Sequence, residues 1–288
     1  MPFQELESRS GSGHSLPRGS FATAAVMPES RSSSSLLQRM EAVANNLMAD
    51  KSSIVRPSST SHPRAYPCPN AFLDLGTNRG DSILKFLEPE NHGGVLASFF
   101  KEMKWNPKEF CVFGFEGNPH FNATLEELEH KHAHEAKLLK IFRQTVVVAE
   151  DGPVTFYLDT VNPGAHFWGS SVLEHHVDVE KSGKVKIIAK GINLGKFVEE
   201  HVDPKGVVMV KMDIEGAEYQ LMRELISSGR LCKKDEQGNN LFDYMNIEFH
   251  PFDIVNPPDG ITPSKEEAAS VYKWILHKCG IKYNPSTD

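Results

Sequence analysis

A glycine-bearing turn follows the short apolar run at 71–75. Residues 74–81 read Asp-Leu-Gly-Thr-Asn-Arg-Gly-Asp and lead into a helix-like stretch. Glycines in such a turn let the backbone bend tightly and let a ligand approach the main chain, while the following helix offers free amides. Asp74 would repel a pyrophosphate but suits a cofactor that carries a cationic ammonium and sulfonium. The turn therefore indicates a cofactor site, with an Asp-capped turn that binds nothing as the alternative.

Acidic residues also follow two later apolar runs. Glu116 comes after the run at 111–115, and Asp213 comes after the run at 207–212. An acid at the tip of the second strand of an open α/β sheet can accept both ribose hydroxyls of a cofactor. A solvated Glu that opens a helix is the alternative. Ligands of such sheets bind outside the carboxyl ends of the strands, so we expect Asp213 to face the same crevice as Glu116.

A carboxylate and an imidazole follow at the next strand end. Glu248 and His250 lie on one face of that strand by alternation. Together with Asp213 they could hold a divalent metal or supply a general base. Asp213 is the first candidate for the base and His250 the second, with a purely structural His250 as the alternative. Glu215 and Glu218 stay open between a site role and the first turn of a helix, where acids are common.

Regular elements must bring these residues together. Apolar runs alternate with amphipathic stretches from residue 71 onward. The expected strands are 71–75, 111–115, 140–148, 154–158, 207–212, 244–249 and 281–283, and the expected helices are 82–87, 94–103, 121–139, 217–228 and 264–277. Strands that alternate with helices imply crossover connections. The sequence therefore predicts an α/β fold with a doubly wound, mostly parallel sheet and helices on both faces.

The amino-terminal part differs in composition. Residues 1–65 are rich in Ser, Gly and Pro, and we predict a disordered or linker segment that can hold a short helix at 36–48. Residues 66–288 would then form one domain. Within it, the segment 165–171, which contains Trp168, is a candidate wall of an acceptor pocket, with a plain turn as the alternative.

Composition limits the partners and the compartment. The formal net charge is −7, so no nucleic-acid partner is expected. No apolar run reaches the roughly 18 residues that a membrane span needs. The four cysteines lie far apart without a Cys-x-x-Cys pair, which predicts reduced thiols in a reducing compartment and a cytoplasmic protein.

The motifs together resemble those of the FkbM-type methyltransferases, a class I family that uses S-adenosylmethionine. The resemblance rests on Asp-x-Gly-x-Asn-x-Gly at 74–80, Phe-Glu-x-Asn-Pro at 115–119, Lys-x-Asp-x-Glu-Gly-Ala-Glu at 211–218 and Glu-x-His at 248–250. It implies a Rossmann-like methyltransferase domain with S-adenosyl-L-methionine as cofactor. The residues that would bind this cofactor are Asp74, Gly76, Thr77, Asn78, Gly80 and Asp81 at the methionine part, Glu116 with Asn118 at the ribose, Thr145 and Val146 at the adenine, and Asp213.

The expected reaction is O-methylation of a hydroxyl on a sugar or another small molecule, with a small-molecule or glycan acceptor as partner. A catalytically silent methyltransferase-like binding module is one alternative. An NAD-dependent oxidoreductase is another, disfavoured because the turn lacks the middle glycine of Gly-x-Gly-x-x-Gly. The family's antiparallel seventh strand has little sequence left after residue 283. A shorter sheet, coverage of that edge by the amino-terminal segment, or a truncated copy would each account for this.

Overall fold

The computed structural model describes residues 68–250 and 265–285. The segment 1–65, with the helix predicted at 36–48, lies outside the described residues. In the described part, none of the helices combines the length and the apolar character that crossing a membrane requires.

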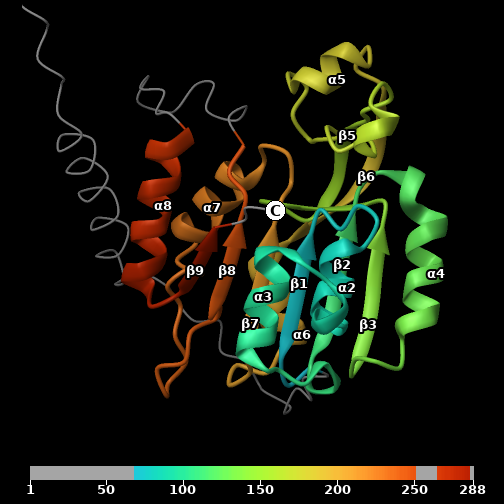
Figure 1. Ribbon diagram of the computed structural model, residues 1–288. Helices are drawn as coiled ribbons and strands as arrows, with labels where there is room; N and C mark the ends of the chain where they lie inside the picture. Colours follow the sequence, from blue (N-terminus) through green and yellow to red (C-terminus); the bar gives the residue numbers. More distant parts are fainter. Residues whose placement is uncertain (1–67, 251–264, 286–288) are drawn as a thin grey trace, which may run out of the picture.

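Six parallel strands form the main sheet, in the order β3-β2-β1-β7-β8-β9 (Figure 1). The strands are β1 (Ala71–Leu75), β2 (Cys111–Glu116), β3 (Leu138–Arg143), β7 (Val208–Met212), β8 (Tyr244–Ile247) and β9 (Lys282–Pro285). Leu75 lies beside Phe115 on one side and Met212 on the other, so the carboxyl ends of β2, β1 and β7 meet at one edge. The strand order reverses at β1, and this is where open α/β sheets bind ligands.

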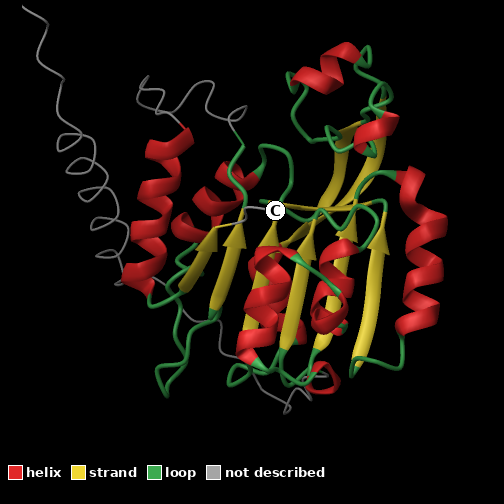
Figure 2. Ribbon diagram, viewed as in Figure 1, coloured by secondary structure: helices red, strands yellow, loops and turns green. Residues whose placement is uncertain are grey.

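Helices cover both faces of this sheet (Figure 2). The α-helices are α2 (Asp81–Leu87), α3 (Gly94–Met103), α4 (Asn122–His132), α5 (Val177–Lys181), α6 (Leu194–His201), α7 (Glu218–Ser227) and α8 (Lys265–Cys279). The 3₁₀ turns are η1 (Pro89–Asn91), η2 (Pro107–Glu109), η3 (Pro119–Phe121) and η4 (Pro163–Ala165). Side chains of β1 alternate between two cores: Phe72 packs with α2, α3 and α4, and Leu73 with α6, α7 and α8. The predicted mostly parallel α/β fold is confirmed.

A second, three-stranded sheet stands above the carboxyl edge of the first (Figure 1). It contains β4 (Thr145–Val148), β6 (Lys186–Asn193) and β5 (Gly152–Tyr157), in that order, and α5 lies in the connection from β5 to β6. The prediction of one strand over 140–148 is wrong, because Gln144 adopts a positive φ of 48° and the chain turns there from one sheet into the other.

Two other boundaries differ from the prediction. The helix expected over 121–139 ends at His132, and β3 already begins at Leu138. Leu138 and Leu139 fit the helical spacing of the preceding apolar residues, so periodicity alone assigns them to the helix. All six strands of the main sheet are parallel, so among the described residues this sheet has no antiparallel seventh strand.

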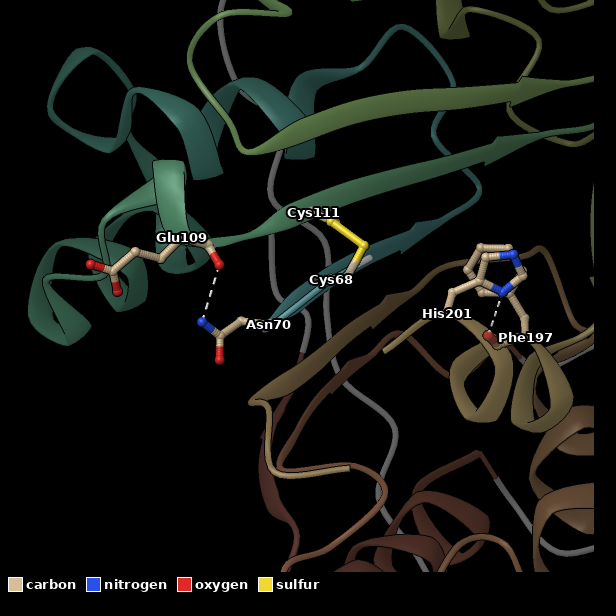
Figure 3. The surroundings of a disulfide bond; sticks show 6 residues. All are labelled: Cys68, Asn70, Glu109, Cys111, Phe197 and His201. Carbon is tan, nitrogen blue, oxygen red and sulfur yellow. Dashed lines mark hydrogen bonds between the residues drawn. A yellow bond between two sulfur atoms is a disulfide. The ribbon is translucent and has the colours of Figure 1, made fainter. Parts of the chain in front are cut away.

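The prediction of reduced thiols is wrong, because the structure pairs all four cysteines. Cys68 bonds to Cys111, and Cys232 bonds to Cys279. The first pair joins the starts of β1 and β2, where Asn70 also donates to the Glu109 carbonyl at 3.1 Å (Figure 3). The two partners are 43 positions apart in the sequence, and they become neighbours only because β1 and β2 are adjacent parallel strands. Disulfides are typical of oxidising compartments, which argues against the predicted cytoplasmic location.

Candidate active site

A cavity of about 300 Å³ opens at the carboxyl edge of the main sheet, below the small sheet. The strand-end turns after β1, β2 and β7 form its floor. Residues of the small sheet and of the β5–β6 connection form its roof, among them Val146, Phe156 and Trp168. The sequence candidates that line it are Gly76, Thr77, Asn78, Asp81, Glu116, Thr145, Val146, Asp213, Glu248 and His250. Asp74, Gly80 and Asn118 do not line the cavity, but Asp74 pairs with Lys211 and Asn118 donates to Glu116, both of which do.

The turn after β1 needs its glycines for two different reasons. Gly76 has a φ of 78°, and a Cβ there would overlap the carbonyl oxygen of Asp213, so β1 and β7 approach closely only with glycine at this position. Gly80 has a φ of 92° and starts α2, but a Cβ there would meet the side chain of Leu128 in the core. Gly76 shapes the cavity wall, whereas Gly80 shapes the packing beneath it.

A buried lysine links the tips of β1 and β7. The Nζ atom of Lys211 lies 3.5 Å from Asp74 and 3.3 Å from Asp213, and it donates to the Gly76 carbonyl at 3.1 Å. Burial raises the pKa of Asp74 to about 6, although Lys211 opposes this. Burial lowers the pKa of Lys211, but the charges of Asp213 and Asp74 outweigh it and raise the value. This cation holds the floor of the cavity together.

Replacing Lys211 by Met is expected to lower the free energy of unfolding by about 3 kcal/mol, because Asp74 stays buried without its counter-charge. Protonation of Asp74 limits the loss. Urea unfolding measures the change. Adding Asp74→Asn to Lys211→Met should restore part of the stability, because the two sites are in contact. Additive losses in the double variant would contradict the pairing.

Glu116 is buried at the tip of β2 and holds two neighbouring turns. Its Oε2 accepts from the Asn78 amide at 2.7 Å, and its Oε1 accepts from the Asn118 amide at 2.6 Å. Burial raises the pKa of Glu116 to about 7, against the effect of these two hydrogen bonds. Close by, a Cβ at Gly117 would collide with Val146 and Phe156, so the small sheet packs directly on this strand tip. The result is a carboxylate beside an apolar wall of the cavity.

His250 lies among four carboxylates. Its Nδ1 is 3.1 Å from Glu218, and its Nε2 is 3.8 Å from Asp213, 3.7 Å from Glu215 and 3.8 Å from Glu248. Burial lowers the pKa of His250, but Glu218, Glu215 and Asp213 outweigh it and raise the pKa to about 9. The surrounding carboxylates thus favour the protonated form of His250, and in that form the imidazole cannot accept a proton.

Glu215 and Glu218 take different roles. Glu218 is fully buried and accepts from the amides of Ile214 at 2.8 Å and Gly216 at 3.0 Å, so it braces the turn after β7. Glu215 lines the cavity with a positive φ of 53°, and His176 lies 3.3 Å from it. Ligand atoms of Asp213, Glu215 and His250 lie within 4.8 Å of one another. This group of possible metal ligands contains Glu215, whereas the sequence predicted Glu248 as its second carboxylate.

Lys211 and Phe156 were not among the predicted site residues. Lys211 could have been identified from its position within the apolar run 207–212, because a buried charge in a strand needs partners on the neighbouring strand. Phe156 gave no signal of its own, because its position depends on how the small sheet packs over β2.

Comparison with known proteins agrees with this geometry. Residues 74–280 match the Methyltransferase FkbM domain, a stretch that contains every strand from β2 to β8 and all the site residues named above. No curated protein and no solved structure matches the chain. A match over most of the chain, on a fold with this strand order and this cavity, establishes the relationship. The protein belongs to the FkbM methyltransferase family.

Proposed function

We propose that the protein transfers a methyl group from S-adenosylmethionine to a hydroxyl oxygen of a small-molecule or glycan acceptor. The observation that carries the proposal is the convergence of Gly76, Glu116 and Asp213, from three adjacent strand tips, on one cavity. An ionised Glu116 accepts hydrogen bonds from ribose hydroxyls. Acidic groups around the floor suit a cationic cofactor and disfavour a pyrophosphate, which argues against NAD.

The residues fit the cofactor in three parts. The turn at 76–78 would hold the methionine part, Glu116 the ribose, and the apolar wall formed by Val146 and Phe156 the adenine. When bound, the cofactor supplies an electrophilic methyl group for in-line displacement. The chain's own contribution is alignment of donor and acceptor, which can be worth about 7–11 kcal/mol. A positioned base adds about 10²–10⁴-fold.

Asp213 is the base in this proposal. One of its oxygens faces Lys211 at 3.3 Å and the other lies 3.8 Å from His250, and about a third of its side chain (31%) remains exposed to the cavity. His250 acts instead as a fixed positive charge that keeps the carboxylates in place. A proton leaving the acceptor hydroxyl would pass to Asp213.

Calorimetry with S-adenosylmethionine, S-adenosylhomocysteine and NAD tests the cofactor assignment. A panel of methyl glycosides and phenols then tests transfer, read as S-adenosylhomocysteine released and methylated product by mass spectrometry. If only NAD binds, the result would favour the alternative of an NAD-dependent oxidoreductase. Binding of S-adenosylmethionine with no transfer to any hydroxyl of the panel would favour the silent module.

Cofactor affinity is expected to fall as the pH falls through 7. Protonation of Glu116, with its pKa of about 7, favours the free protein, because the ribose hydroxyls bind the ionised form. S-adenosylhomocysteine should bind about tenfold more weakly near pH 6 than near pH 8. Glu116→Gln should weaken binding at pH 8 by roughly 1.5–3 kcal/mol and flatten this dependence. An equally steep dependence in Glu116→Gln would assign it to another group, with Asp74 first in line.

Asp213, Glu215 and His250 could together hold a divalent ion, which would acidify the acceptor hydroxyl. A metal ligand must be a neutral imidazole, and the surrounding carboxylates favour protonated His250. We therefore propose transfer without a metal and expect full turnover after exhaustive EDTA treatment. Loss of turnover that Mg²⁺ restores would overturn this.

A further inference from the structure

Trp168 is a large aromatic residue at the rim of the cavity. It lies in the connection from β5 to β6, lines the cavity, and is 55% exposed. The loop that carries it packs tightly, because a Cβ at Gly169 would collide with Asp178. An exposed indole held by a tightly packed loop beside a cavity is suited to ligand contact.

Two asparagines hold the loop on either side of Trp168. Asn78 donates from its side chain to the His166 carbonyl at 3.3 Å, and Asn118 donates to the Ser170 hydroxyl at 3.0 Å. The Ser170 hydroxyl in turn donates to the Phe167 carbonyl at 3.1 Å. His166 and Phe167 both have positive φ, at 51° and 53°, a conformation that is unfavourable for residues other than glycine. Such strain persists only where surrounding contacts maintain it.

Both asparagines are themselves held by Glu116. Their backbone amides donate to its two oxygens, while their side chains reach the loop. A ribose hydroxyl that donates to Glu116 would share its carboxylate with the backbone amides of Asn78 and Asn118. It would thereby alter the hydrogen bonds of both asparagines. Occupancy of the cofactor pocket would then act on the loop from both sides of Trp168.

We propose that Trp168 binds the methyl acceptor, and that cofactor binding at Glu116 sets its position through Asn78 and Asn118. This rests on the proposed function. The acceptor it fits is an uncharged, hydroxyl-bearing ring. A sulfonium in the cavity repels a second cation, and Asp213 and Glu215 already have cationic or N–H partners. Their oxygens can still accept hydrogen bonds from hydroxyls, while the indole packs on the ring face.

The test uses the full chain labelled with 5-fluorotryptophan and titrated with S-adenosylhomocysteine. The chain has three tryptophans, so the fluorine spectrum has one resonance each for Trp105, Trp168 and Trp274. Trp168→Phe, at an exposed position, identifies its resonance. We expect the chemical shift of Trp168 to change during the titration, and the curve to give the same dissociation constant as calorimetry. The chemical shift of Trp274 should stay constant. Binding that leaves the Trp168 resonance unmoved would overturn the link, whereas absence of binding would overturn the proposed function instead.

Ser170→Ala removes the group that Asn118 holds and leaves Glu116 unchanged. We expect it to bind S-adenosylhomocysteine within about threefold of the parent and to lose most of the Trp168 shift. Ser98→Ala, on the exposed side of α3, is the matched control and should keep the full shift. A full shift in Ser170→Ala would mean that the cofactor acts on Trp168 directly, and would overturn the route through Asn118.

Acceptor binding is read separately with the best methyl glycoside or phenol of the panel. Trp168→Ala should raise KM for it by about tenfold or more, with Trp168→Phe close to the parent and the affinity for S-adenosylhomocysteine unchanged. An unchanged KM in Trp168→Ala would remove Trp168 from the acceptor site.

Discussion

Replacing Asp213 by Asn is expected to lower turnover by about 10²–10⁴-fold, because the amide cannot take the proton of the acceptor hydroxyl. The substitution keeps the size of the side chain. The backbone amide of residue 213 donates to the Leu75 carbonyl at 3.1 Å, and this hydrogen bond should hold the turn in the parent and in the Asn variant alike. The effect should appear in kcat, in single-turnover mixing with the best acceptor of the panel. Calorimetry with S-adenosylhomocysteine should show a much smaller change.

Two controls separate this role from a general loss of charge. Asp235→Asn changes a carboxylate in the loop after α7, which does not line the cavity, and should leave turnover unchanged. His250→Gln removes the cation without removing the base and should reduce turnover less than Asp213→Asn. If His250→Gln is the more damaging of the two, the roles assigned to these residues must be exchanged.

The convergence of the site could be predicted from the sequence because it follows from strand order. Once the runs at 71–75, 111–115 and 207–212 form neighbouring parallel strands, the residues after them must share one edge. Glu248 and His250 were placed by strand alternation, but β8 ends at Ile247. Alternation no longer applies beyond that residue. Glu248 still lies 3.8 Å from His250, but the carboxylate with a ligand atom within 4.8 Å of those of both Asp213 and His250 is Glu215, in the turn after β7.

The strand predicted at 154–158 corresponds to β5, but the small sheet itself could not be predicted, because its pairing depends on β6, where no strand was predicted. The strand β6 pairs in parallel with β4 and antiparallel with β5, and much of it is exposed, including Ile188 at 68%. Its sequence therefore lacks the continuous apolar run of the buried strands. Without β6, neither the roof over Glu116 nor the position of Phe156 follows from sequence, although both decide how the cofactor pocket closes.

Removing a disulfide is expected to lower the free energy of unfolding more than the Lys211→Met substitution does. Cys68→Ala with Cys111→Ala should lower the free energy of unfolding by about 4 kcal/mol, because the unfolded chain regains the freedom of a long loop. The second pair, whose partners are 47 positions apart in the sequence, should contribute a similar amount. Urea unfolding of each paired variant, with and without reductant, measures both contributions.

The location of the first bridge predicts that catalysis is spared. Cys68 and Cys111 join the starts of β1 and β2 (Figure 3), at the opposite end of the sheet from the cavity. The Cys68 carbonyl also accepts from the Asp203 amide at 2.8 Å. Affinity for S-adenosylhomocysteine should therefore match the parent at temperatures where the double variant is folded. Reductant should destabilise the parent and leave a variant without cysteines unchanged. Alkylation of four thiols in the unreduced, denatured protein, together with unchanged stability, would show that these bridges do not form.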